Sequence, residues 1–355
     1  MPQPEGAALN FGFNPILTQV GLNLLPKTDQ FIARRIAPNV PVASPVGSYN
    51  FWTPDDFLRR NGKELANYEA APLGGFAGTQ LSYSVKNFGI GTPYTAMDLA
   101  NARRGGMSDQ AFKNAKARWV TTQALLELEF RAQSLFQTAA NWTTTRAGVT
   151  SGPSASQFIQ WDQAASSPVD DVLAWKRVMR LLTGHEPNTM IITEPIWLVL
   201  RKNASLIDRI KYGGTMDRPT EITIDQIKAL FEIENIWIPK ATYNSAAEGV
   251  TTPVFGDIWS AKTVWLGYVA AQAGFEEPSA AYHFSWTGDT SQGLPSGMQG
   301  GQGPQPFGST QNDEGLFVRE YADQPRAAIV IEGTLWTSPN VVSAGLGFTA
   351  TAAIA

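Results

Sequence analysis

The clearest periodic pattern of apolar side chains follows Ser108. Phe112, Trp119 and Leu126 recur at intervals of seven residues. Ser108 can accept a hydrogen bond from the first turn of a helix, and the acidic residue after it suits the positive end of the helix dipole. We therefore predict a helix over about residues 109–138. At 1.5 Å per residue it would be roughly 45 Å long, enough to cross a whole domain.

Two stretches before this helix alternate apolar and polar side chains with the period of β-strands. Tyr49 and Phe51 belong to the first stretch, and residues 81–85 to the second. We expect a long hairpin whose tip, about residues 54–78, is too charged to form a core. The charged side chains of this tip are Asp55, Asp56, Arg59, Arg60, Lys63, Glu64 and Glu69. The isolated Gly89-Ile90-Gly91 predicts a turn after the hairpin.

Helix and strand patterns alternate between residues 160 and 240. A helix begins at Pro168, carries two acidic residues in its first turn and ends before Gly184. Thr223 and Gln226 form the pattern of a capping box at the start of a later helix. The other predicted elements are strands at 189–193 and 236–238 and a helix at 195–200. This alternation predicts a compact α/β domain.

The two ends of the chain and one internal stretch favour extended or irregular structure. Residues 1–46 contain seven Pro and no long periodic segment, so we expect an extended arm that must lie on another surface. Residues 287–315 contain eight Gly and three Pro, which predicts an irregular surface loop ordered by a neighbouring molecule. Strands are predicted at 263–269, 328–332 and 341–348.

Composition narrows the class of protein. Only 16 % of residues are charged, against about 25 % in an ordinary soluble protein, so much of the surface is uncharged. The absence of Cys excludes disulfides, thiolate nucleophiles and Cys-ligated metal sites. No basic and apolar leader and no run of 18 apolar residues is present, so we expect a cytosolically made, soluble product that does not bind membranes.

Charge is unevenly distributed along the chain, whose net charge is −4. Residues 1–160 hold 14 Lys and Arg against 10 Asp and Glu, whereas residues 161–355 hold 13 against 21. Neither half has the strongly basic balance of a nucleic-acid-binding domain.

Candidate catalytic chemistry is sparse. The two histidines are His185, which we expect to meet the last carbonyls of a helix, and His283, in a predicted strand. No nucleophile elbow, zinc-protease, calcium-loop or phosphate-loop motif occurs. Adjacent acidic residues could supply glycosidase carboxylates or a cation site, but neighbours in a strand point apart and the helical pair suits the helix dipole. These pairs are Asp55 with Asp56, Asp170 with Asp171, Glu276 with Glu277, and Asp313 with Glu314. We predict no catalytic, cofactor-binding or metal-binding residue.

The order of these elements resembles the major capsid protein of tailed bacteriophages, which has the Hong Kong 97-type α+β fold. The stretch MRLLTGHEPNTMIITEPIWLVLRKNASLIDRIKYG (179–213) is similar to the apical domain of that family. The stretches SAKTVWLGYVAAQAG (260–274) and ADQPRAAIVIEGTLWTSPNVVSAGLGF (322–348) resemble its returning strands in the branch related to the lambda-type head protein.

The resemblance implies a division of the chain into the parts of such a subunit. These parts are an N-terminal arm (1–46), an extended hairpin or E-loop (47–92), a peripheral domain with its spine helix at about 109–138 (93–159), an apical domain that includes the loop 287–315 (160–320), and return strands of the peripheral domain (321–355).

The resemblance also implies a structural function. Such a chain self-assembles into pentamers and hexamers of an icosahedral head around double-stranded DNA, which it contacts non-specifically, and it has no enzymatic activity. Its expected location is the virion, after assembly in the host cytoplasm. Its further partners would be a separate scaffolding protein and a portal, with a decoration protein left open.

The hairpin tip is the predicted contact with neighbouring subunits, by pairing of opposite charges. The residues are Arg59, Arg60, Lys63, Glu64 and Glu69. Two alternatives remain. One is a carbohydrate-active enzyme that uses carboxylates and Trp platforms, and the other is a different virion component such as a tube or decoration protein.

Overall fold

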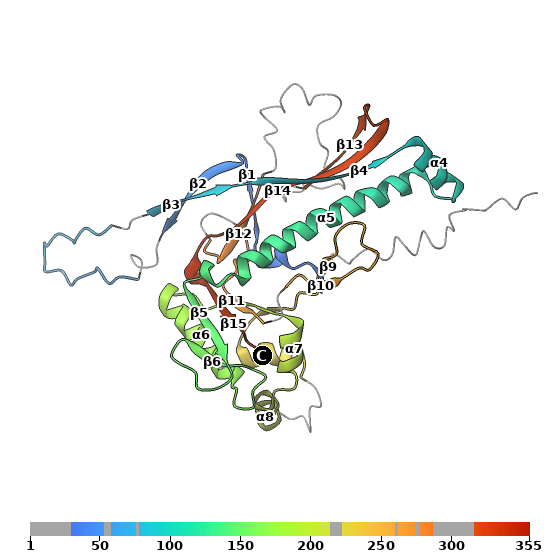
Figure 1. Cartoon of the computed structure of the whole chain (residues 1–355). Coiled ribbons are helices and arrows are strands. Elements are labelled where there is room, and N and C mark those ends of the chain that lie inside the picture. The colour runs from blue at the N-terminus through green and yellow to red at the C-terminus, as the bar shows by residue number, and fades with distance from the viewer. Residues whose placement is uncertain are drawn as a thin grey trace, which may run out of the picture.

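A mixed α+β architecture built on two large sheets and one long helix is seen in the computed structural model (Figure 1). The structure describes residues 30–52, 58–75, 78–213, 222–259, 262–273, 277–286 and 316–355. The predictions for residues 1–29 and for the loop 287–315 therefore lie outside the described residues. So do those for Asp55, Asp56, Glu276, Asp313 and Glu314.

The long helix α5 (Asp109–Gln137) forms where the seven-residue pattern predicts it. Ser108 caps it, because its Oγ accepts a hydrogen bond from the N–H of Ala111 at 3.2 Å. A shorter helix, α4 (Ala96–Arg104), precedes it and is capped by Thr95. The bidentate pair of Arg103 with Asp109, at 2.6 and 2.5 Å, joins the two helices.

A five-stranded sheet lies along α5 (Figure 1). Its central strand β14 pairs antiparallel with β12, β13 and β4, and β1 pairs parallel with β12. Arg131 of α5 stacks its guanidinium 3.2 Å from the ring centre of Phe88 on this sheet. The strands are β1 (Asn39–Val42), β4 (Lys86–Tyr94), β12 (Ala281–Trp286), β13 (Leu316–Asp323) and β14 (Ala328–Val341).

The predicted turn at Gly89-Ile90-Gly91 is wrong, because these residues lie inside β4. Gly91 pairs with Glu332 and Gly89 with Thr334. A Cβ on Gly91 would come within 3.1 Å of Val330 Cγ1, so the glycine permits a close approach of two strands instead of a change of direction.

A six-stranded sheet forms the second layer, in the order β6-β5-β15-β11-β7-β8. Four of its strands come from outside the stretch 160–240, so the predicted α/β pattern is completed by distant parts of the chain. The strands are β5 (Thr144–Val149), β6 (Gln157–Ile159), β7 (Thr189–Ile192), β8 (Asn235–Trp237), β11 (Val264–Gly267) and β15 (Gly347–Thr351).

Four helices accompany this sheet. They are α6 (Pro168–Thr183), α7 (Glu194–Leu200), α8 (Ala204–Gly213) and α9 (Ile224–Phe231). Helix α6 ends as predicted at Gly184, whose φ of 76° is a left-handed conformation that favours glycine. The predicted capping box of α9 also forms, with Gln226 Oε1 accepting the N–H of Thr223 at 2.9 Å.

The predicted strand over 341–348 is wrong in its centre. Strand β14 ends at Val341, a 3₁₀ turn occupies Ala344–Leu346, and β15 begins at Gly347. The chain changes sheets here, from the five-stranded to the six-stranded one, which a run of apolar residues does not indicate by itself.

The predicted hairpin is formed by β2 (Val46–Trp52) and β3 (Gly78–Ser84), which pair antiparallel. In Figure 1 it leads to a segment that projects far from the rest of the described chain. Its base rests on the five-stranded sheet, where Tyr83 stacks on Phe284 with ring centres 4.8 Å apart. The remaining short elements are α2 (Ala33–Ile36), a 3₁₀ turn at Ala139–Asn141, β9 (Thr242–Asn244) and β10 (Phe255–Asp257).

Candidate intersubunit surface

We define the hairpin tip as residues 58–75, every one of which is exposed. Arg59, Arg60, Lys63, Glu64 and Glu69 all lie on it. Two of these charged residues meet, because Lys63 Nζ lies 2.5 Å from Glu69 Oε1. The structure does not bring the others into a cluster.

The Lys63–Glu69 pair shapes one turn of the tip. Glu69 Oε2 also accepts the N–H of Ala66 at 3.1 Å, and the N–H of Glu69 donates to the carbonyl of Ala66 at 3.0 Å. The Lys63 ammonium, followed by the Ala66 N–H, lowers the pKa of Glu69 below its usual value. Because this pair is exposed, it fixes local geometry without contributing to the core.

Large apolar side chains on the tip were missed by the charge-based prediction. Tyr68 and Leu73 are as exposed as in an extended chain, at 106 % and 101 %. Leu58 and Leu65 on the same segment are also exposed. The available signal was the presence of bulky apolar residues in a charged stretch that has no core of its own. Such a cluster on one projecting segment is typical of a surface that contacts another molecule.

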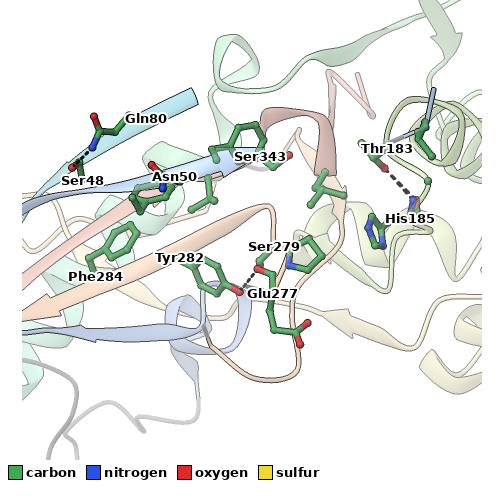
Figure 2. A pocket seen from close by; sticks show the side chains of 17 residues that line it. Ser48, Asn50, Gln80, Thr183, His185, Glu277, Ser279, Tyr282, Phe284 and Ser343 are labelled. Carbon is green, nitrogen blue, oxygen red and sulfur yellow. Dashed lines mark hydrogen bonds between the residues drawn. The ribbon is translucent and has the colours of Figure 1, made fainter. Parts of the chain in front are cut away.

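A partly open cleft of about 990 Å³ lies at the base of the hairpin (Figure 2). Strands β2 and β3 line one side through residues such as Tyr49 and Gln80, and the end of α6 with His185 lines the other. The hydroxyl of Tyr282 donates to the carbonyl of Glu277 at 2.8 Å on its floor. The lining is mainly apolar and holds no group of convergent acids and bases.

His185 contacts an aromatic ring in this cleft. Its ring centre lies 5.3 Å from that of Tyr268, and its backbone N–H donates to Thr183 Oγ1 at 3.3 Å. The prediction placed the imidazole on the last helical carbonyls. The contacts of its side chain are with Tyr268 instead, because Gly184 turns the chain away from the axis of α6.

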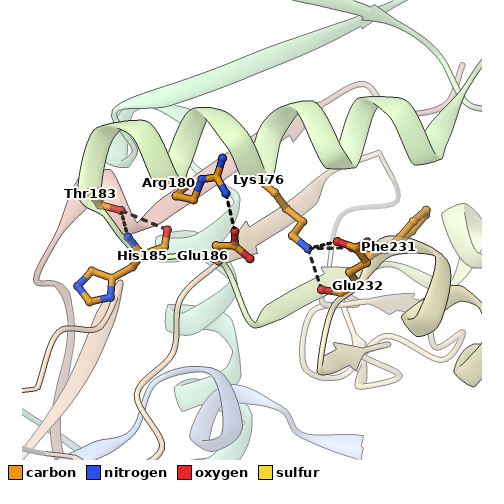
Figure 3. Close-up of polar contacts among 7 residues, drawn as sticks. All are labelled: Lys176, Arg180, Thr183, His185, Glu186, Phe231 and Glu232. Atoms are coloured by element: carbon orange, nitrogen blue, oxygen red, sulfur yellow. Dashed lines mark hydrogen bonds and ion pairs between the residues drawn. The ribbon is translucent and has the colours of Figure 1, made fainter.

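The polar network beside α6 is structural (Figure 3). Lys176 is buried, and its Nζ donates to the carbonyls of Phe231 and Glu232 at 3.4 and 2.9 Å. It also pairs with Glu232 Oε2 at 3.2 Å. This lysine therefore caps the C-terminal end of α9, where positive charge is favoured.

The acidic pair at the start of α6 splits into two different environments. Asp170 pairs with Arg209 at 2.8 Å, and hydrogen bonds from Ser167 and Arg209 lower its pKa. Asp171 accepts a hydrogen bond from Trp161 Nε1 at 3.1 Å, and its burial raises its pKa to about 6. The two side chains point to different partners, so they do not form a catalytic pair.

Glu129 is a buried carboxylate on the apolar face of α5. Its oxygens accept hydrogen bonds from the N–H groups of Ile32 and Ala33, at 2.9 to 3.1 Å, and from Trp259 Nε1 at 2.7 Å. Burial raises its pKa, while these three donors favour the charged form. Glu129 thus joins α2, α5 and the segment after β10. Its one signal in the sequence is its place, with Glu127, in the otherwise apolar stretch 124–130.

His283 is buried in β12, the strand in which it is predicted. Its Nε2 lies against Thr337 Oγ1 of the neighbouring strand β14. Burial, with smaller effects of Arg34 and Arg131, lowers its pKa to about 3. The ring is therefore neutral at physiological pH and acts as a packed polar group of the sheet.

Two kinds of site can be assessed over the described part of the chain. There, no group of three or more His, Asp or Glu side chains is placed to hold a metal ion. No helix within those residues is long and apolar enough to cross a membrane.

Comparisons with known proteins give one relative by sequence. No protein-family model matches the chain. A stretch of 124 residues is 35 % identical to the major capsid protein of Burkholderia phage BcepMu. This match covers 34 % of the chain and 37 % of that relative, so the chain matches little more than a third of the relative's length.

Solved structures give likeness over nearly the whole chain. A phage-related protein from Bordetella bronchiseptica RB50 aligns with a TM-score of 0.63 over 96 % of this chain and 97 % of that one, at 21 % identity. The capsid of cyanophage P-SCSP1u aligns with a TM-score of 0.51 over 89 % and 86 %, at 10 % identity. These likenesses show a shared fold, and with the capsid relative they confirm the resemblance to phage major capsid proteins.

Proposed function

We propose that this chain, related in sequence to a phage major capsid protein and in fold to a phage capsid, builds an icosahedral phage head. The single observation that carries this proposal is the exposure of large apolar side chains on the hairpin tip. This tip projects from the subunit and exposes Tyr68 and Leu73 fully, which is unfavourable in a free monomer. A contact with another subunit would bury these side chains.

The proposed subunit has the Hong Kong 97-type fold. Its arm would be residues 1–46, its extended hairpin 47–92, its apical domain 160–320, and its peripheral domain 93–159 with 321–355. The packing of α5 along the five-stranded sheet supports a peripheral layer with a spine helix. The six-stranded sheet supports a second unit, and it takes β5, β6 and β15 from the proposed peripheral segments.

The proposed assembly consists of pentamers and hexamers that enclose double-stranded DNA by non-specific contact. The charged residues of the tip would contact a neighbouring subunit, and they are Arg59, Arg60, Lys63, Glu64 and Glu69. A scaffolding protein and a portal would be further partners, and assembly would take place in the host cytoplasm. This function needs no catalytic residue, in keeping with the structural roles of Asp170, Asp171 and His283.

Electron microscopy of the purified full chain, combined with sedimentation, tests this proposal. We expect closed shells, either from the chain alone or on addition of a scaffolding protein. Tubes would instead identify a different virion component. Small discrete particles under all these conditions, with turnover of a carbohydrate substrate that is lost on changing one acidic residue, would identify an enzyme.

A further inference from the structure

We infer that the exposed loop between β9 and β10 is the surface of a second copy of this chain that receives the hairpin tip. This inference rests on the proposed function and names the contact that the tip would make. We call residues 242–257, which comprise β9, β10 and the loop between them, the receiving loop. It lies below α5 in Figure 1, far from the projecting tip of the same subunit.

The receiving loop exposes apolar side chains, as the tip does. Phe255 is 72 % exposed, and Val250 and Val254 are each more than half exposed. An aromatic ring with two branched aliphatic side chains on one short hairpin is a small apolar surface. The tip offers Tyr68 and Leu73 as its counterpart, and contact between the two would remove both sets from water.

The two surfaces are also complementary in charge. Once Lys63 is paired with Glu69, residues 58–75 retain Arg59 and Arg60 against a single acidic residue, Glu64. Asp55 and Asp56 precede this segment and lie outside the described residues. The receiving loop carries Glu248 and Asp257 and contains no Lys or Arg. All four unlike charges are exposed, at Arg59, Arg60, Glu248 and Asp257. Unlike charges around an apolar centre favour one orientation of docking.

The receiving loop is held by contacts within the chain. Asn244 Oδ1 accepts hydrogen bonds from the N–H groups of Ala246 and Val254, at 3.1 and 2.9 Å. The N–H of Ser245 donates to the carbonyl of Val254 at 2.8 Å. The ring of Tyr243 packs edge to face on Phe130 of α5 at 4.7 Å. These contacts hold the loop on the body of the subunit, so little conformational entropy is lost on docking.

The contact joins two different surfaces, so it is heterologous. A tip that projects from one part of the subunit and a loop carried on another can link copies head to tail (Figure 1). Head-to-tail contacts close into rings when the rotation between copies permits it. The tip and loop therefore supply the kind of contact that pentamers and hexamers require.

A charge exchange tests the pairing. Arg59→Glu with Arg60→Glu should lower the yield of shells about tenfold, and so should Glu248→Arg with Asp257→Arg. The four changes together should restore most of the yield, because the charges are again unlike. Asp208→Arg with Glu234→Arg, an equal change of charge on exposed residues outside the loop, is the matched control and should leave the yield unchanged.

A cross-linking experiment locates the contact independently of charge. The chain has no Cys, so Tyr68→Cys with Phe255→Cys introduces the two thiols at the surfaces in question. A short bis-maleimide added to assembled shells should give a ladder of covalent oligomers. Tyr68→Cys with Leu198→Cys, which places the second thiol at an exposed position of α7, should not.

The outcomes separate this inference from the proposed function. If the unmodified chain forms no shells with or without scaffold, the proposed function fails. The receiving loop is the wrong surface if the unmodified chain forms shells and Glu248→Arg with Asp257→Arg gives the same yield. It is also the wrong surface if the four changes together do not restore the yield. A covalent ladder from the Leu198 pair alone would overturn the assignment in the same way. An unchanged thermal midpoint of the unassembled variants would show that any lost yield is not due to misfolding.

Discussion

The six-stranded sheet with its helices, which we call the sheet unit, buries its large aromatic side chains, whereas the hairpin tip exposes its large apolar side chains. In the sheet unit, Trp175 stacks on Phe348 at 4.8 Å and on Trp161 at 5.8 Å, and all three are buried. In the tip, Tyr68 and Leu73 contact solvent over their whole surface. The first region is stabilised by contacts within the chain, whereas the second gains no burial from the described part of the chain. Folding and assembly should therefore respond to different substitutions.

The largest loss of folding stability is expected from the centre of the sheet unit. Trp175→Ala removes a ring packed against three aromatic neighbours, which should cost about 3–5 kcal/mol in the free energy of unfolding. Denaturant unfolding of the unassembled subunit measures this cost. Leu182→Ala, at an exposed position of the same helix, is the control and should cost less than about 1 kcal/mol. Equal effects of the two would show that the aromatic stack does not stabilise the sheet unit.

Removal of the buried carboxylate of Glu129 should have the next largest effect. Glu129→Ala leaves the N–H groups of Ile32, Ala33 and Trp259 without their acceptor, which should cost on the order of 3 kcal/mol. Glu127→Ala on the same helix removes only a partly exposed pair with Arg131 and should cost less than about 1 kcal/mol. Hydrogen exchange of the Ile32 and Ala33 amides measures where the contact is lost. We expect both amides to lose protection in Glu129→Ala and to keep it in Glu127→Ala.

His283 should make folding stability depend on pH. Its pKa is about 3 in the folded chain and about 6.5 in the unfolded chain, so the unfolded chain binds more protons between these values. Its contribution to stability is thus complete above pH 6.5 and is lost as pH falls towards 3. His283→Asn should cost about 1–2 kcal/mol at pH 8, and this deficit should shrink by pH 4.

The matched control for this prediction is His185→Asn, which changes an exposed ring. At pH 8 it should cost less than about 1 kcal/mol, because the ring is exposed. A deficit for His283→Asn that stays constant from pH 8 to pH 4 would mean that the buried ring does not exclude protons. Shell formation should survive both changes, because neither ring belongs to the tip or to the receiving loop.

Asp171 should show the opposite dependence on pH, at a smaller magnitude. Its pKa is raised to about 6, so the folded chain binds more protons between pH 4 and 6 and stability falls as pH rises through this range. Asp171→Asn keeps an acceptor for Trp161 and should be at least as stable as the parent at pH 7, with no advantage at pH 4. Asp170→Asn, which loses the pair with Arg209, should give no such advantage at pH 7.

The smallest effect on folding, with the greatest effect on assembly, is expected at the tip. Replacement of residues 60–73 by a Gly-Ser linker of equal length removes no buried side chain, so the thermal midpoint of the subunit should not change. Shells should be lost. A lowered midpoint would place the tip in the folding core, and normal shells would show that it is dispensable.

The sequence predicts the elements whose signals are local. Helix α5 follows from the cap at Ser108 and the regular spacing of Phe112 and Trp119, and α6 follows from its acidic first turn and Gly184. Strand β7 is predicted by the apolar run 190–192, and all four of its residues are buried. These signals depend on residues that are close in the sequence, so they can be recognised without knowledge of the fold.

The features that the sequence does not predict depend on distant partners. The glycines of β4 resemble a turn until β14 is seen to pair along them. The role of Glu129 depends on donors about 97 residues before it and 130 residues after it. For the candidate surface, the charge pattern of the sequence indicates Arg59 and Lys63. The exposure of Tyr68 and Leu73 is seen only in the structure. The receiving loop has no sequence motif. It is identified by the exposure of its apolar side chains, which depends on the fold.

The pairing of early strands with late ones has a consequence for synthesis. Strand β1 pairs with β12, and β4 pairs with β14, so segments made first wait for partners that emerge from the ribosome near the end of translation. The base of the hairpin waits as well, since Tyr83 rests on Phe284. A chain that ends before residue 281 therefore lacks the strands that β1 and β4 pair with, and it also lacks Phe284, on which the base of the hairpin rests.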